Sequence, residues 1–189
     1  MMLKKPRPFV LGGLVLMAAL LMLSWTQVWF TFELNDGSTV EALGSDAVGS
    51  LAALALSVFA LVAALSISTV NVRRVLGIVA AIVGVIIIVT WQSAVADPIV
   101  ASAAIITEAT GISGTDSLHA LVASTAATPW SVPAIGAGSL IVLIGLGATI
   151  TAHRWPIPTK KYDRDSTVIA DDPASQWDAQ SRGIDPTAR

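Results

Sequence analysis

The chain of 189 residues lacks cysteine, so it has no disulfide framework, no thiolate metal site and no cysteine nucleophile. Charge is also scarce, because 13% of the residues are charged against about 25% in soluble globular domains. Hydrophobic residues make up 54% of the chain. A soluble globule this short would leave too much of that apolar surface in water. The composition therefore indicates a membrane protein.

Charges are missing from four tracts long enough to cross a bilayer. Such gaps mark spans, because a charged side chain at the bilayer centre costs about 2.5–3.5 kcal/mol. We predict transmembrane helices over residues 9–30, 48–70, 75–95 and 132–152, each near the roughly 20 residues that a span requires. The apolar run 98–107 is too short to be a fifth span. The fold expected is an all-α membrane protein, a bundle of four transmembrane helices.

The first tract follows Lys4, Lys5 and Arg7, as the core of a secretory signal would. Its apolar run is longer than the roughly 7–15 residues of a signal core, and no small-residue cleavage site precedes Trp25 and Trp29. We therefore interpret this tract as the first span.

Basic residues are absent from two of the loops between these spans. All eleven Lys and Arg fall in segments 1–8, 71–74 and 153–189, whereas loops 31–47 and 96–131 hold seven acidic residues and no basic one. The positive-inside rule then places both termini and the 71–74 turn in the cytoplasm of a bacterium, with the multi-pass protein in its cytoplasmic membrane. The residues that determine this topology are Lys4, Lys5, Arg7, Arg73, Arg74, Arg154, Lys160 and Lys161.

This assignment gives a net charge of +5 inside and −7 outside, because the inner segments also hold six acidic residues. Most of the asymmetry serves to set topology. An acidic outer surface would in addition attract a cationic partner.

Small residues recur along one face of three spans. They are Ala53, Ser57, Ala60, Ala64 and Ser68 in the second span, Gly77, Ala81 and Gly84 in the third, and Ala134, Gly138, Gly145 and Thr149 in the fourth. Lipid provides little hydrophobic drive between helices, so smooth faces that allow close approach join them. These stripes are seams within the bundle or seams with a partner protein.

The two outer loops carry signals for short elements. The turn sequence Asn35-Asp36-Gly37 predicts a small hairpin, whose partner would be the second outer loop. In that second loop, the mildly apolar stretches 99–107 and 118–126 predict two short helices that lie on the membrane or cap the bundle.

Groups that could carry chemistry are few. His119 and His153 lie about a membrane apart, so they share no metal, and no ionisable residue lies deep in a span to build a proton relay. We find no nucleophile triad, phosphate-binding glycine loop or zinc signature. The sequence therefore predicts no enzyme, no cofactor and no nucleic-acid partner.

Tryptophan and glutamine gather near the outer ends of two spans. Trp25, Gln27 and Trp29 are in the first span, where the two indoles share a helix face, and Trp91 and Gln92 are at a similar depth in the third. One interpretation is an aromatic belt at the headgroup level. The other is an amphipathic pocket or interface for an aromatic or heterocyclic ligand.

From Arg154 onward the sequence is polar and interrupted by proline, which predicts a mostly disordered cytoplasmic tail. Asp172 and Gly183 are suited to begin and end one short helix that contains Trp177, and a helix this short is marginal alone in water. The tail is thus a solvated segment or a docking motif that folds on a partner or back onto the bundle. The residues of that motif are Asp172, Trp177, Asp178, Gly183, Asp185 and Pro186.

The ending Trp177-Asp178, Gly183 and Asp185-Pro186-Thr187 resembles the tail motif of the actinobacterial tryptophan-biosynthesis-associated (Trp-operon-associated) membrane protein family, in which it follows four spans. The pair Arg73-Arg74 and the positions of Trp25 and Trp91 also fit that family. Gln180, Ser181 and Ile184 depart from it, because the family commonly has Leu, Asp and an acidic residue there. The resemblance implies a gene near those for tryptophan synthesis and transfers no catalytic residue.

Two functions remain at the level of sequence. The first is an accessory or assembly subunit, linked to tryptophan metabolism, that contacts the bilayer and other membrane or cytoplasmic proteins through its tail and small-residue faces. The alternative is a carrier or sensor for tryptophan or an indole compound, built on the tryptophan and glutamine cluster.

Overall fold

The computed structural model describes residues 6–154 and the side chains of residues 8–153. The predictions for Lys4, Lys5, Lys160, Lys161 and the tail docking motif lie outside the described residues.

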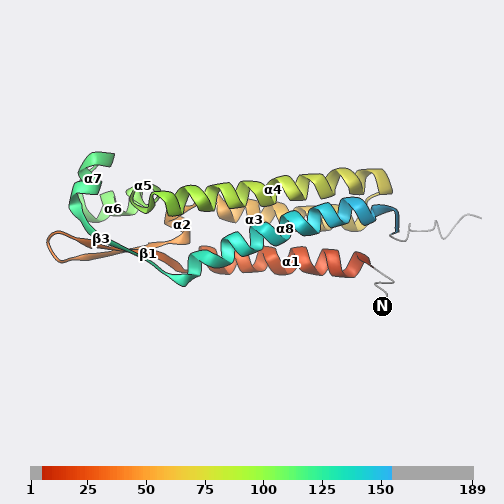
Figure 1. Ribbon diagram of the computed structural model, residues 1–189, viewed down its shortest axis with the longest axis horizontal. Coiled ribbons are helices and arrows are strands. Elements are labelled where there is room, and N and C mark those ends of the chain that lie inside the picture. Colours follow the sequence, from red (N-terminus) through yellow and green to blue (C-terminus); the bar gives the residue numbers. More distant parts are fainter. Residues whose placement is uncertain (1–5, 155–189) are drawn as a thin grey trace, which may run out of the picture. The chain divides into compact units, whose positions relative to one another are not determined.

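Four long helices lie side by side in Figure 1: α1 (Pro6–Trp25), α3 (Leu51–Ile67), α4 (Val70–Ala96) and α8 (Val132–Thr151). Contacts join α1 to α3 and to α8, and join α4 to α8 and to α3, so the helices form a closed ring. Three of them are long and apolar enough to cross a membrane, and α3 is a shorter apolar helix of 17 residues.

The contact between α4 and α8 is made by glycines. A Cβ added to Gly77 would lie 2.7 Å from the carbonyl oxygen of Gly145, and one added to Gly84 would lie 2.8 Å from that of Gly138. Both distances are shorter than real Cβ contacts, so the backbones of α4 and α8 can approach this closely only because these positions are glycine. This confirms that the small-residue stripes of the third and fourth spans form a seam within the bundle.

The stripe predicted in the second span does not pack in this way. Ala53, Ser57 and Ala60 are exposed, whereas α3 buries Leu51, Ala55, Val58, Leu61 and Leu65. Its larger apolar side chains fill the core, so the small-residue face turns away from the bundle. The prediction of a seam within the bundle is therefore wrong for these positions.

Helix α3 is shorter at both ends than the predicted span 48–70, and two other helix boundaries differ most from those expected. Helix α1 ends at Trp25 rather than at residue 30, because the residues that follow enter a strand. Helix α4 begins at Val70 after Thr69 in extended conformation, so Arg73 and Arg74 lie inside the helix rather than in a 71–74 turn. Arginine suits a helix well, and the connection between α3 and α4 shortens to residues 68–69.

The chain is not all-α, because three strands form a small antiparallel sheet. Its order is β2-β1-β3, with β1 at Val28–Leu34, β2 at Thr39–Leu43 and β3 at Val122–Ala127. The hairpin predicted at Asn35-Asp36-Gly37 is confirmed, with Gly37 at φ +82° in its turn. Its partner in the second outer loop, strand β3, is confirmed as well.

Four short helices lie near the sheet: α2 (Gly44–Ala47), α5 (Pro98–Ala101), α6 (Ala103–Thr110) and α7 (Thr115–Leu121). Single 3-10 turns at Pro129–Ser131 and Ala152–Arg154 flank α8. The stretch 99–107 is largely helical as predicted, but 118–126 is not one helix. It leaves α7 at Leu121 and continues as β3, where pairing with β1 provides its backbone hydrogen bonds.

The sheet, α5, α6 and α7 lie together at one end of the bundle, which we call the sheet end (Figure 1). The start of α4 and the end of α8 lie at the opposite end, which we call the arginine end because Arg73 is buried there.

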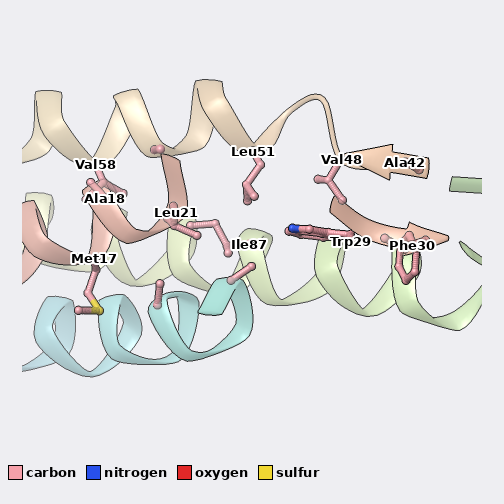
Figure 2. Packing of buried hydrophobic residues seen from close by; sticks show 14 of the residues in the cluster. Met17, Ala18, Leu21, Trp29, Phe30, Ala42, Val48, Leu51, Val58 and Ile87 are labelled. Atoms are coloured by element: carbon pink, nitrogen blue, oxygen red, sulfur yellow. The ribbon is translucent and has the colours of Figure 1, made fainter. Parts of the chain in front are cut away.

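Figure 2 shows Trp29 where the bundle meets the sheet, with Leu51 and Ile87 toward the helices and Phe30 toward the sheet. All four side chains belong to one continuous buried cluster that extends from the helices to the sheet. The strands and helices therefore share a single hydrophobic core.

Candidate functional site at the sheet end

Trp29 lies on β1 and not on the first helix. Its side chain is 0% exposed, and its indole Nε1 donates a hydrogen bond to the carbonyl oxygen of Ser24 at 2.8 Å. Gly44 provides the space for the ring, because a Cβ there would lie 2.8 Å from Trp29 Nε1. Trp25 and Trp29 consequently do not share a helix face, and Trp29 instead closes the sheet end of the bundle.

The other members of the predicted cluster divide by exposure. Trp25 at the end of α1 and Trp91 in α4 are half-buried, and the indole N–H of each is buried without a hydrogen-bond partner among the described residues. Gln27 lies in the turn before β1, where its side chain donates to Thr26 Oγ1 at 3.2 Å, and Gln92 is exposed. The proposed pocket or interface for a ligand stays a prediction.

Acidic residues gather at the sheet end, where several of them have structural partners. Asp46 accepts a hydrogen bond from the backbone of Leu43 at 2.8 Å, and Asp97 accepts one from Val100 at 3.1 Å, so each caps a short helix. His119 Nε2 lies 3.3 Å from Asp97 Oδ2, which links α7 to the start of α5.

Asp36 in the hairpin turn has a pKa below its ordinary value. The hydroxyl of Ser38 donates to its carboxylate at 2.6 Å and is the main cause, and the backbone N–H of Ser38 donates at 2.9 Å. Hydrogen bonds to the charged form stabilise it relative to the protonated form. The turn is thus organised around an ionised aspartate.

Two hollows lie at the sheet end. One of about 380 Å³ is between the α2–α3 connection and the ends of α4 and α5, and its polar lining includes Ser50, Thr90, Ser93 and Asp97. The other, of about 450 Å³, lies between the hairpin turn and the end of α6. Within residues 6–154 no group of three or more His, Asp or Glu side chains is arranged to hold a metal ion.

The topology residues that the structure describes lie at the arginine end, and one of them has a role that the sequence did not reveal. Arg7 lies in the first turn of α1, Arg154 ends the last 3-10 turn and Arg74 is exposed. Arg73 is 1% exposed, and its guanidinium donates to the carbonyl oxygens of Ser68 at 2.8 Å and Ala152 at 3.4 Å. A cation at two helix C-termini is favoured by the helix dipoles. A double-arginine pattern gives no signal for this inward orientation.

A bundle of apolar helices with an acidic sheet end defines a helical membrane protein. The chain belongs to the tryptophan-associated transmembrane protein family, whose sequence model matches residues 11–187. This confirms the family that the tail motif and the spans resemble. No curated protein and no solved structure gives a significant match to the chain.

Proposed function

We propose that the chain is a non-catalytic accessory or assembly subunit of the bacterial cytoplasmic membrane, linked to tryptophan metabolism. The packed interior of the bundle carries this proposal. Leu14, Leu21, Ile87 and Ile141 are completely buried between the helices, and Trp29 closes the sheet end above them. An interior filled with side chains suits a scaffold better than a conduit.

We also propose that the chain has four spans with both termini inside. Helix α3 has 17 residues, the lower end of the range that crosses a bilayer, and it packs beside α1 and α4. With α3 as a span, the acidic sheet end is outside and the arginine end is in the cytoplasm.

Two features are available to protein partners. The face of α3 that carries Ala53, Ser57 and Ala60 is exposed, and small residues allow another helix to approach closely. The tail motif around Trp177 would provide a second contact in the cytoplasm.

Crosslinking in native membranes followed by purification tests the assembly role. The full chain is compared with a chain lacking residues 171–189 and with Ala60→Phe. Leu143→Phe serves as control, because Leu143 is a large exposed side chain on another helix, α8. We expect the full chain and the control to retain the same defined partner, and the other two to lose it. The proposal fails if no partner is recovered, or if recovery is equal in all four.

A second candidate is a carrier or sensor for tryptophan or an indole compound. The buried indole N–H groups of Trp25 and Trp91, which have no hydrogen-bond partner in the described part of the chain, favour it. An unpaired buried donor costs about 1–3 kcal/mol, which an acceptor atom of a ligand such as a carboxylate would relieve.

Binding and transport of labelled tryptophan and indole by the purified protein in vesicles test this candidate. Trp25→Phe and Trp91→Phe should weaken saturable binding, whereas Trp130→Phe should not, because that ring is 44% exposed. Absence of saturable binding and of transport in the unaltered protein would exclude it.

A further inference from the structure

Strand β3 is an open edge of the sheet. The order β2-β1-β3 gives β3 one strand neighbour, and Ala123–Ala127 are exposed. The other edge differs, because β2 contacts α6. Edge strands usually carry charges or proline that prevent further pairing, but β3 has the sequence Val-Ala-Ser-Thr-Ala-Ala. A bulge interrupts its pairing only at its first residues, opposite Glu33 and Leu34.

One hydrogen bond shows which residues of β3 direct their backbone N–H and C=O groups toward β1 and which direct them toward the open side. Thr128 donates its N–H to the carbonyl oxygen of Trp29 at 2.8 Å, just beyond the end of β3. Hydrogen-bonded pairs alternate along an antiparallel ladder, so Ala126 and Ser124 also bond toward β1. The N–H and C=O groups of Thr125 and Ala127 then point away from β1, toward the open side.

The two faces of the sheet differ in polarity. Ser124 lies opposite Glu33, and its hydroxyl donates to the Glu33 carboxylate at 3.1 Å, so that carboxylate lies over β3. Thr125 lies opposite Phe32, whose side chain is completely buried on the other face. A strand added beyond β3 would therefore meet a carboxylate on one face and would extend the apolar face of the sheet on the other.

Charge complements this geometry. Seven acidic residues and no Lys or Arg lie between residues 28 and 47 and between 96 and 131, the segments that build the sheet end. The Glu33 carboxylate lies over β3, and the next strand position is about 4.8 Å from β3, within the Debye length of about 8 Å at physiological salt. Lys or Arg at alternate positions of an incoming strand would face Glu33.

A second copy of the chain does not suit this edge. Antiparallel pairing of two β3 strands has its two-fold axis perpendicular to the sheet. Because β1 and β3 run in roughly the same direction as the helices (Figure 1), the second bundle would point the opposite way and could not share the membrane.

We propose that β3 accepts an extended segment of a partner protein, with basic residues at alternate positions and apolar residues between them, as an added strand of the sheet. Main-chain hydrogen bonds to Thr125 and Ala127 give affinity, and the Glu33 carboxylate selects the basic face. This inference rests on the assembly function proposed above and names a partner class for the sheet end.

The test uses the full chain in lipid nanodiscs and a blocked, fluorescent peptide that alternates Lys with Val. One control peptide alternates Glu with Val, and another keeps every Lys but replaces alternate Val residues by Pro, which removes ladder donors without changing charge. We expect saturable binding of the Lys–Val peptide, with slower amide exchange over residues 122–128. Both control peptides should bind at least about tenfold more weakly, which corresponds to about 1.4 kcal/mol.

Two variants locate the binding. Thr125→Pro removes an outward N–H, which an edge strand tolerates, and Thr125→Lys adds the kind of charge that protects natural edges. Each should weaken the Lys–Val peptide about tenfold, while Ala104→Lys, on the exposed face of α6, adds the same charge away from the edge and should change little. Thermal unfolding of each variant confirms that it is folded.

Equal binding of the Lys–Val and proline-containing peptides would reduce the effect to charge alone and overturn the proposal. Absence of peptide binding to the unaltered protein would also overturn the proposal. A crosslink between two copies of the Thr125→Cys variant would overturn it as well, because β3 would then pair with a second copy. The peptide experiment leaves the α3 face and the tail untouched, so its failure is distinguishable from failure of the assembly function.

Discussion

Trp29 is the residue at which helix and strand expectations compete. Trp25 and Trp29 are four apart, so an apolar run through both fits one face of a helix. The same segment, Val28–Leu34, is rich in aromatic and β-branched residues, which favours a strand. Hydropathy alone does not distinguish a helix from a strand here. In the structure Phe30, Phe32 and Leu34 are buried at every second position, which is the periodicity of a strand.

Replacing Trp29 by Phe tests its hydrogen bond to Ser24. The change leaves the Ser24 carbonyl without the indole donor and removes part of a completely buried ring. We expect a loss of about 1–3 kcal/mol in the free energy of unfolding, measured by denaturant titration in detergent. Trp130→Phe, at an exposed position, should change stability by less than about 0.5 kcal/mol. Equal effects of the two changes would contradict this role.

Asp36 should respond to the loss of Ser38. In Ser38→Ala the hydroxyl that most lowers the Asp36 pKa is absent, so the pKa should rise toward its ordinary value of about 3.9. A lowered pKa in the folded state means that ionised Asp36 stabilises the turn above the unfolded pKa, and that this contribution is lost as pH falls through the folded value. NMR titration of the Asp36 carboxyl in the unaltered chain and in Ser38→Ala measures the two pKa values. An unchanged pKa in the variant would contradict the role assigned to Ser38.

At the scale of elements, the glycine pattern predicted the α4–α8 seam but not the orientation of α3. Small residues permit close approach, yet larger apolar side chains such as Leu51, Val58 and Leu65 decide which face enters the core. Local pattern therefore identifies candidate seams, and the packing of the whole bundle selects among them.

Gly84→Ala on this seam and Gly136→Ala at an exposed position of α8 are a matched pair. A Cβ on Gly84 would lie 2.8 Å from the Gly138 carbonyl oxygen, so α4 and α8 must separate, whereas nothing lies within 4 Å of a Cβ on Gly136. We expect Gly84→Ala to lower the melting temperature in detergent. Gly136→Ala should hold or raise it, since alanine favours a helix over glycine by up to about 1 kcal/mol. A lower melting temperature for Gly136→Ala alone would refute the seam.

Arg73 and Arg74 are neighbours with different roles. Arg73→Lys cannot reach both Ser68 and Ala152 with a planar fork, so we expect a loss of about 1.5–3 kcal/mol in stability. Arg74→Lys keeps an exposed charge and should be neutral. Denaturant titration compares the two, and similar behaviour would mean that the buried guanidinium does not join the helix ends.

At the scale of the whole molecule, charge distribution predicted which segments lie at each end. The structure places the acidic sheet end and the start of α4, which holds Arg73 and Arg74, at opposite ends of the bundle. Sequence also predicted the hairpin from its Asn35-Asp36-Gly37 turn. The strand β3 was harder to predict, because Val122–Ala127 has no turn signal of its own and is defined by pairing with residues far away in the sequence.

Sidedness can be tested directly, because the chain has no native cysteine. Glu108→Cys at the sheet end and His153→Cys at the arginine end are both exposed positions. We expect a membrane-impermeant maleimide to label Glu108→Cys in intact cells, and to label His153→Cys only after the cells are permeabilised. The opposite pattern, or labelling of both in intact cells, would contradict the orientation.

The strand order has a consequence for biosynthesis. β1 pairs with β2 as soon as the hairpin is made, but its other side stays open until β3 has been synthesised, after α3, α4 and α7. In the proposed four-span topology, insertion of only one of α3 and α4 would bring β3 to the wrong side of the bilayer, and the hairpin would keep an unpaired edge. A completed sheet therefore requires that both helices of the pair be inserted, and an incomplete sheet leaves β1 with an exposed row of unpaired N–H and C=O groups.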